Sequence, residues 1–176
     1  MKRATIVALI ALAGLPTGWF GARALTPELD RAAQGIALFK TYCLPLARHE
    51  RPQVGPALEP LKISLGPDPF FDPRSGWLLE RTERECSITD VMRLLTKDER
   101  DRFAALAAEA IPPALPMLEP GVLQRPFRFD ALHFWAQYPP GDKRRWGVNL
   151  VRFAAEGPDS NTTLSITAPP FAVVSP

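Results

Sequence analysis

The segment GWLLERTERECSI, which runs from Gly76 to Ile88, is the part of the chain around which we expect the fold to be organised. Alternating residues at its two ends and a charged run between them are typical of a β-hairpin. Trp77 and Leu79 are predicted to share one face of the first strand, and Cys86 and Ile88 one face of the second. The hairpin therefore carries one of the two cysteines of the 176-residue chain on a face that we expect to be buried.

The second cysteine, Cys43, lies at the end of a predicted helix. The tripeptide Thr26-Pro27-Glu28 places a capping threonine before a proline and an acid, which is a typical helix start. Apolar residues then recur every three or four positions as far as Cys43, so one face of a helix from Pro27 to Tyr42 is expected to be buried. Pro45 is expected to stop this helix.

The first 24 residues have the organisation of a secretory signal peptide. The chain begins with Lys2 and Arg3, runs apolar from Ala4 to Leu15, and has the small residues Ala22 and Ala24 shortly afterwards. This pattern predicts cleavage after Ala24 and a periplasmic or secreted protein. The alternative is a membrane anchor, but a spanning helix needs about 20 apolar residues and this run is shorter.

Export would place the two cysteines in a compartment where disulfides persist. We therefore expect one bridge, between Cys43 and Cys86, that fastens the first helix to the hairpin. Closing a loop of this length stabilises a domain by about 4 kcal/mol. A redox-active thiol pair is the alternative reading, but it would need a closely spaced motif such as Cys-x-x-Cys, which the sequence lacks.

Net charge gives no support for nucleic-acid binding. The chain has 21 Lys and Arg against 19 Asp and Glu, but three of the basic residues lie in the predicted signal peptide. The remainder is close to neutral, whereas nucleic-acid-binding domains are usually strongly basic. After cleavage the sequence also predicts no membrane span.

Residues 44–75 are predicted to be a long connector. Seven prolines interrupt this stretch, and such density is incompatible with a normal helix or a central strand. Its apolar residues indicate that part of it packs on the body of the protein. It is interpreted as a wrapped structural loop, and a loop that binds a partner or covers a site is the alternative.

Two helices and three strands are predicted after the hairpin. A short helix is expected over Thr89–Leu95, and a capping box at Thr96-Lys97-Asp98-Glu99 opens a helix from Lys97 to about Ile111. Three antiparallel strands are expected near residues 126–138, 145–154 and 163–168. The apolar alternation changes parity in the first of these, which predicts a bulge or break near Asp130-Ala131.

The predicted fold is thus a single α+β domain over residues 25–176. We expect an antiparallel sheet of four or five strands, with the two main helices packed on one face and one disulfide.

No catalytic or metal-binding motif stands out. His49 and His133 could complete a zinc site with the two cysteines, but the spacing does not match that of a zinc site and we expect no cofactor. A small hydrolase using His133 with a nearby Asp or Ser is the enzymatic alternative. Asp130 is close to His133 in sequence, but nothing selects a nucleophile among the serines and no Gly-x-Ser-x-Gly elbow is present. The simpler interpretation of His133 is a strand residue within an aromatic cluster.

One basic and aromatic cluster is a candidate binding site. Lys143, Arg144, Arg145 and Trp146 follow one another after a proline-rich turn. Such a cluster could hold an anionic headgroup, a polysaccharide or a protein carboxylate, and the alternative is a charged strand entry beside a polar turn. Arg144, Arg145 and Trp146, together with His133, are therefore the candidate binding residues.

Several short motifs resemble those of small, exported, two-cysteine proteins of bacteria to which no activity is assigned. They are Phe39-x-x-Tyr42-Cys43, Gly76-Trp77, Cys86 with Ile88, and Arg144-Arg145-Trp146-Gly147-Val148. The resemblance implies an exported α+β domain and no active site.

We therefore expect a non-enzymatic binding or protein-interaction module. An envelope protein or a cell-wall polysaccharide is the expected ligand, and a structural envelope protein is a further alternative.

Overall fold

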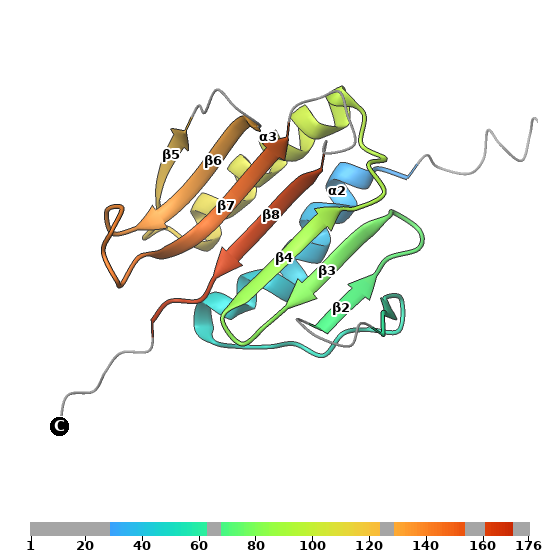
Figure 1. Cartoon of the computed structure of the whole chain (residues 1–176), viewed down its shortest axis with the longest axis horizontal. Coiled ribbons are helices and arrows are strands. Elements are labelled where there is room, and N and C mark those ends of the chain that lie inside the picture. Colours follow the sequence, from blue (N-terminus) through green and yellow to red (C-terminus); the bar gives the residue numbers. More distant parts are fainter. Residues whose placement is uncertain (1–28, 63–67, 124–128, 154–160, 171–176) are drawn as a thin grey trace, which may run out of the picture.

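The computed structural model describes residues 29–62, 68–123, 129–153 and 161–170. Within these ranges eight strands form one antiparallel sheet, in the order β1-β2-β3-β4-β8-β7-β6-β5, and two α-helices cover one of its faces (Figure 1). The predicted signal peptide lies outside the described residues. The elements are α2 (Arg31–Leu38), the π-helical η1 (Phe39–Cys43), the 3-10 helix η2 (Leu44–Arg48), β1 (Glu59–Pro60), β2 (Asp68–Phe71), β3 (Trp77–Arg81), β4 (Glu85–Asp90), α3 (Lys97–Ala114), β5 (Glu119–Leu123), β6 (Phe129–Gln137), β7 (Trp146–Phe153) and β8 (Thr162–Thr167).

The sheet has eight strands, so the prediction of four or five was wrong. The hairpin and the three C-terminal strands form as predicted, as β3, β4, β6, β7 and β8. The missed strands are β1, β2 and β5, which contain Pro60, Pro69 and Pro120 and lie at or next to the two edges of the sheet. An edge strand pairs along one side only, so it tolerates the missing N–H of a proline. The segment 44–75 is therefore not an irregular connector throughout.

The first described helix, α2, begins at Arg31. Asp30 is its N-cap and accepts a hydrogen bond from the Ala33 N–H at 3.0 Å. The start predicted at Thr26-Pro27-Glu28 lies outside the described residues. Instead of ending at Tyr42, the helix continues first as the wider π-helical η1 and then as the tighter 3-10 helix η2, with Pro45 in the first turn of η2.

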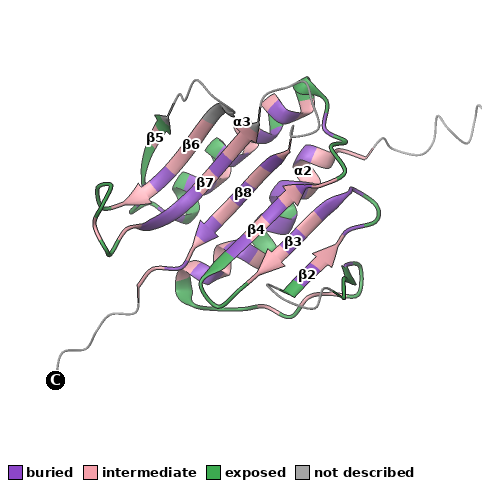
Figure 2. Ribbon diagram, viewed as in Figure 1, coloured by how far each residue is buried: buried purple, intermediate pink, exposed green. Residues whose placement is uncertain are grey.

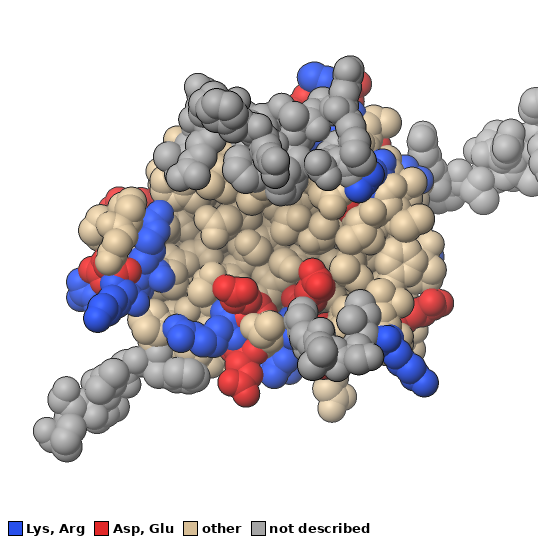
Figure 3. All heavy atoms as spheres, viewed as in Figure 1, with Lys and Arg blue, Asp and Glu red and all other residues tan. Residues whose placement is uncertain are grey.

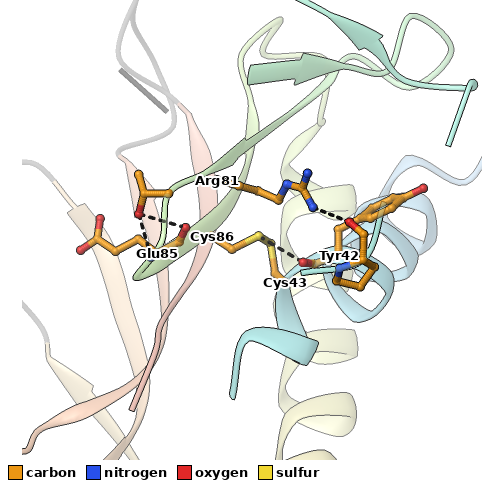
Figure 4. Close-up of a disulfide and its surroundings, with 7 residues drawn as sticks. Tyr42, Cys43, Arg81, Glu85 and Cys86 are labelled. Atoms are coloured by element: carbon orange, nitrogen blue, oxygen red, sulfur yellow. Dashed lines mark hydrogen bonds between the residues drawn. A yellow bond between two sulfur atoms is a disulfide. The ribbon is translucent and has the colours of Figure 1, made fainter. Parts of the chain in front are cut away.

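The predicted disulfide joins η1 to β4 (Figure 4). Cys43 and Cys86 are both buried, and their Cα atoms are 5.2 Å apart. The proline-rich segment packs beside them, because Gly55 donates to the Tyr42 hydroxyl at 3.2 Å and Arg81 donates to the Pro52 carbonyl at 2.7 Å. These contacts support the interpretation of this part of the segment as a wrapped structural loop.

The predicted capping box at the start of α3 is confirmed. Thr96 accepts from the Glu99 N–H at 3.2 Å, and the Glu99 carboxylate accepts from the Thr96 N–H at 2.7 Å. The helix runs to Ala114 and not to Ile111, because Pro112 and Pro113 occupy its last turn. There the missing N–H groups interrupt few helical bonds, and both prolines are exposed.

The short helix predicted over Thr89–Leu95 does not form. Thr89 and Asp90 instead complete β4. The buried carboxylate of Asp90 accepts hydrogen bonds from the N–H groups of Leu94 and Leu95, both at 3.0 Å. Such side-chain bonds to the backbone compete with helix formation and hold this stretch as a turn.

The C-terminal strands follow the predicted alternation. Along β8, Thr162, Leu164 and Ile166 are buried, whereas Thr163 and Ser165 are half-buried. Buried and half-buried residues alternate in the same way along β3 and β4 (Figure 2). The pairing of β6 with β7 shifts by one residue between Phe129 and Ala131, which confirms the predicted irregularity there.

The core lies between the sheet and the two helices. Trp77 is buried against α2, where its indole N–H donates to the Arg31 carbonyl at 2.9 Å. Gly35 makes this possible, because a Cβ there would lie 2.6 Å from the indole ring. Phe103 of α3 packs against the Trp77 side chain, and the centroids of the two rings are 4.9 Å apart. Apolar burial of this kind is the main stabilising contribution in the fold.

The chain is arranged as two halves, each a helix followed by an antiparallel meander of four strands. The first contains α2 and β1 to β4, and the second contains α3 and β5 to β8. The halves join where β4 pairs with β8, and Ser87 is opposite Ser165 at the middle of that register. The last described strand is therefore at the centre of the sheet.

Candidate functional site

The face of the sheet opposite α2 and α3 is open in the part of the chain that the structure describes (Figure 1). Strand pairing aligns its side chains in two neighbouring rows that cross the strands. One row contains Glu80, Ser87, Ser165, Asn149, Phe134 and Gly121. The other contains Glu85, Thr167, Gly147, Ala136 and Glu119.

Three hollows lie along these rows. Their volumes are about 680, 200 and 350 Å³. The largest shares Ala136 and Arg145 with the smallest, which in turn shares Asn149 and Thr167 with the third. They therefore form one continuous depression, here called the cross-strand groove. It is lined by Met117, Glu119, Pro120, Phe134, Ala136, Gln137, Tyr138, Pro139, Pro140, Arg145, Trp146, Gly147, Asn149, Thr163, Ser165, Ile166, Thr167, Glu80, Thr82, Glu85 and Ser87.

One end of the groove is aromatic and is lined by Arg145 and, further along the same hollow, by Glu119. The Arg145 guanidinium donates to the Tyr138 carbonyl at 2.7 Å and lies over the Phe134 ring, 5.4 Å from its centroid. The Phe134 ring in turn lies directly on Gly121, where any Cβ would overlap it. Arg145 is therefore held in place by two contacts that leave its charge uncompensated, since the structure gives it no ion pair among the described residues.

The other end of the groove is acidic. Glu80 and Glu85 line it together with Thr82, and the structure gives neither carboxylate an ion pair or a hydrogen bond within its described ranges. Thr82 shapes this end, because its hydroxyl accepts from the N–H groups of Arg84 and Glu85 at 3.2 and 2.9 Å. Figure 3 shows acidic residues at the lower part of this face with basic residues among them, and basic residues beside acidic ones at its left edge.

The floor between the two ends is uncharged and polar. It consists of the hydroxyls of Ser87, Ser165 and Thr167 and the amide of Asn149, with Gly147 beside them. All lie in paired strands, so the backbone beneath them is held by the ladder. Hydroxyl and amide side chains both donate and accept, and the floor can therefore bind a ligand rich in polar groups.

Arg144 and Arg145, which are adjacent in sequence, have different surroundings. Arg144 pairs with Asp142 at 2.8 Å and stacks on Tyr138, 4.3 Å from the ring centroid. Hydrogen bonds from its side chain and backbone lower the pKa of Asp142 to about 2. Arg144 thus stabilises the turn, whereas Arg145 faces the groove. Lys143 is exposed in the same turn.

Trp146 faces mainly the core. It is buried, and its indole N–H donates to the Gln137 side chain at 2.7 Å. Of the four candidate binding residues, only Arg145 and Trp146 line the groove. The residues missed by the sequence are the small polar ones of the floor, which resemble ordinary exposed strand positions.

His133 lies on the helix-covered face, opposite Leu150 in the register and away from the groove. Burial and the nearby charge of Arg152 lower its pKa. Ser87 is on the other face of the sheet, and Ser75 is four strands away, buried and bonded to Asp72. Neither serine is near His133. The Asp130 side chain and Ser64 lie outside the described parts of the structure. The structure therefore brings neither Ser75 nor Ser87 to His133.

The described ranges contain no group of three or more His, Cys, Asp or Glu side chains placed to hold a metal ion. They also contain no helix with the length and apolar character needed to cross a bilayer.

Comparison with known proteins adds no further constraint: no family model, no curated protein and no solved structure matches this chain.

Proposed function

We propose that this chain is a non-enzymatic binding module that works outside the cytoplasm and holds its ligand in the cross-strand groove. The observation that carries the proposal is the continuity of the groove, because three hollows share lining residues along one open sheet face. Its largest hollow, about 680 Å³, is within the usual size range of ligand pockets. Its lining offers anchoring charges at both ends and hydrogen-bonding groups between them.

The compartment in this proposal is the periplasm or the extracellular space. It is supported by the buried Cys43–Cys86 bridge, since disulfides persist in oxidising compartments and are rare in the cytosol. The test is to express the precursor in a bacterium and determine the intact mass of the protein in each cell fraction. We expect an oxidised chain beginning at Leu25 outside the cytoplasm. Recovery of the uncleaved chain only from the cytoplasm would remove this part of the proposal.

The groove is tested by filling it. Ser165→Trp places an indole on the floor, and Ala105→Trp places the same side chain on an exposed position of α3, on the other side of the molecule. Both variants and the parent protein are applied to arrays of synthetic peptides and of cell-wall oligosaccharides. We expect saturable binding that Ser165→Trp abolishes and Ala105→Trp leaves intact.

Equal binding by both tryptophan variants would mean that the ligand lies elsewhere. The same arrays, analysed by mass spectrometry, test the hydrolase alternative. Turnover of an array member that depends on His133 would favour that alternative over the proposal.

A further inference from the structure

We infer that the ligand of the cross-strand groove is an extended peptide segment of a partner protein, with an acidic and a basic side chain five or six residues apart. The inference rests on the proposed function and specifies the ligand class. It follows from the charges at the ends of the groove, from the distance between them and from the way in which its aromatic rings are already covered.

The two ends of the groove differ in charge, because Arg145 and Glu119 line one end and Glu80 and Glu85 line the other. Arg145 is anchored over Phe134, and Glu80 and Glu85 lie at the far end without ion pairs among the described residues. A ligand that is complementary to both ends must carry a carboxylate and a cation. An uncharged chain would leave all three groups without partners on binding, and desolvation of an unpaired charge is unfavourable.

The separation of the charges sets the length of the ligand. Glu80, Ser87, Ser165, Asn149 and Phe134 are successive partners across five strands. Four strand spacings of about 4.8 Å give roughly 19 Å between the first and the last. An extended peptide advances roughly 3.4 Å per residue, so this distance corresponds to five or six residues.

The polar floor suits a peptide backbone. An extended segment lying across the strands presents N–H and C=O groups to Ser87, Ser165, Thr167 and Asn149, whose side chains both donate and accept. Addition to a sheet edge is less favoured, because the edge strands β1 and β5 contain Pro60 and Pro120.

A polysaccharide is a poorer match, because sugar rings bind largely by stacking on exposed aromatic faces. The aromatic rings at the Arg145 end are covered. Phe134 lies between Gly121 and the Arg145 guanidinium, and Tyr138 is covered by Arg144 at 4.3 Å. Arginines that occupy these faces favour a ligand held by charge and hydrogen bonds.

The experiment uses the exported, oxidised protein and a set of fluorescent peptides built on a Ser/Thr/Gly background. Each carries one Asp and one Lys separated by three, five, six or nine residues, in both orders, and a matching set has Asn and Gln instead. Binding is measured by fluorescence polarisation. We expect one order to bind best at a separation of five or six, with affinity falling as salt rises.

Variants assign the two ends. Arg145→Ala and the double variant Glu80→Gln/Glu85→Gln should each weaken binding about tenfold, as expected for partly exposed charged contacts. The double charge reversal Glu80→Lys/Glu85→Lys should shift the preference to a third peptide set in which Asp replaces the Lys. Glu119→Gln should strengthen binding. Glu119 lines the hollow that contains Arg145, and its negative charge would repel the acidic side chain that Arg145 binds. Glu109→Lys, an exposed charge change on α3, is the matched control and should have no effect.

Affinity that is independent of the Asp–Lys separation, or equal for the charged and uncharged peptides, would overturn the inference. Oligosaccharide binding that Ser165→Trp abolishes, with no peptide binding, would overturn it and leave the proposed binding function in place. Absence of binding to both classes would count against the inference and the proposed function together.

Discussion

Removal of the Cys43–Cys86 bridge tests the architecture most directly. The two cysteines are 43 residues apart in sequence and both are buried, at 0% and 2% exposure. Loop-closure entropy for a cross-link of this span gives about 4 kcal/mol at 25 °C. We expect reduction of the parent protein to lower its free energy of unfolding by about that amount, and its Tm by about 12 °C. The variant Cys43→Ala/Cys86→Ala should lose slightly more, because truncation of two buried side chains also leaves small cavities.

The assay is equilibrium unfolding in urea, followed by tryptophan fluorescence, for the oxidised, reduced and double-alanine proteins. Reduction keeps both sulfur atoms in place, so the difference between the oxidised and reduced forms isolates the chain constraint from the packing. If reduction changed the free energy of unfolding by less than about 1 kcal/mol, the bridge would not be the fastening between η1 and β4 that the fold indicates.

Three further predictions concern single positions. Gly147→Ala should destabilise the protein by more than about 3 kcal/mol in urea unfolding, because the new Cβ would lie 2.1 Å from the Trp135 carbonyl oxygen. Gly141→Ala is the control, because a Cβ there would have no other atom within 4 Å. This variant should lose only about 1 kcal/mol, as a result of the positive φ at that position. Thr96→Ala should cost about 1 kcal/mol through loss of the capping box, and equal stability would contradict the role of the cap. The pKa of His133 is lower in the folded protein than its ordinary value of about 6.5 in the unfolded chain. As pH drops from about 7.5 to about 5, the unfolded chain therefore binds a proton at His133 more readily than the folded protein does, and stability should fall. His133→Gln should flatten this dependence, and an unchanged profile would show that another group is responsible.

The parts of the fold that could be predicted depend on local patterns. The alternation in β3, β4 and β8, the capping box at Thr96 and the parity change near Ala131 each arise within a few residues. These features are present in the tertiary structure because burial on one face of the sheet favours the same conformation as the local sequence does.

The parts that were missed depend on position within the sheet. A proline argues against a strand only where both sides must pair. The sequence does not tell that β5 is an edge strand, or that Pro69 of β2 lies beyond the two residues of β2 that pair with β1. The turn at Asp90 was missed for a related reason, because its carboxylate becomes an acceptor for Leu94 and Leu95 only once β4 is buried.

The candidate site was only partly predictable. The basic cluster that contains Arg145 is visible in the sequence, because it is charged and local. The remainder of the groove is assembled by pairing β4 with β8, which brings Ser87 next to Ser165 across 78 residues. Small polar residues on separate strands carry no signal of their own until that pairing is known.

The central position of β8 also bears on when the molecule can form during synthesis. Each half can arrange its own meander, but the two sheets have no shared strand pair until Thr162–Thr167 emerge from the ribosome. In a nascent chain that ends earlier, β4 and β7 are edge strands, and the side of each that pairs with β8 in the finished protein has no partner. Completion of the fold therefore waits for the last described strand, and long-range pairings of this kind form slowly.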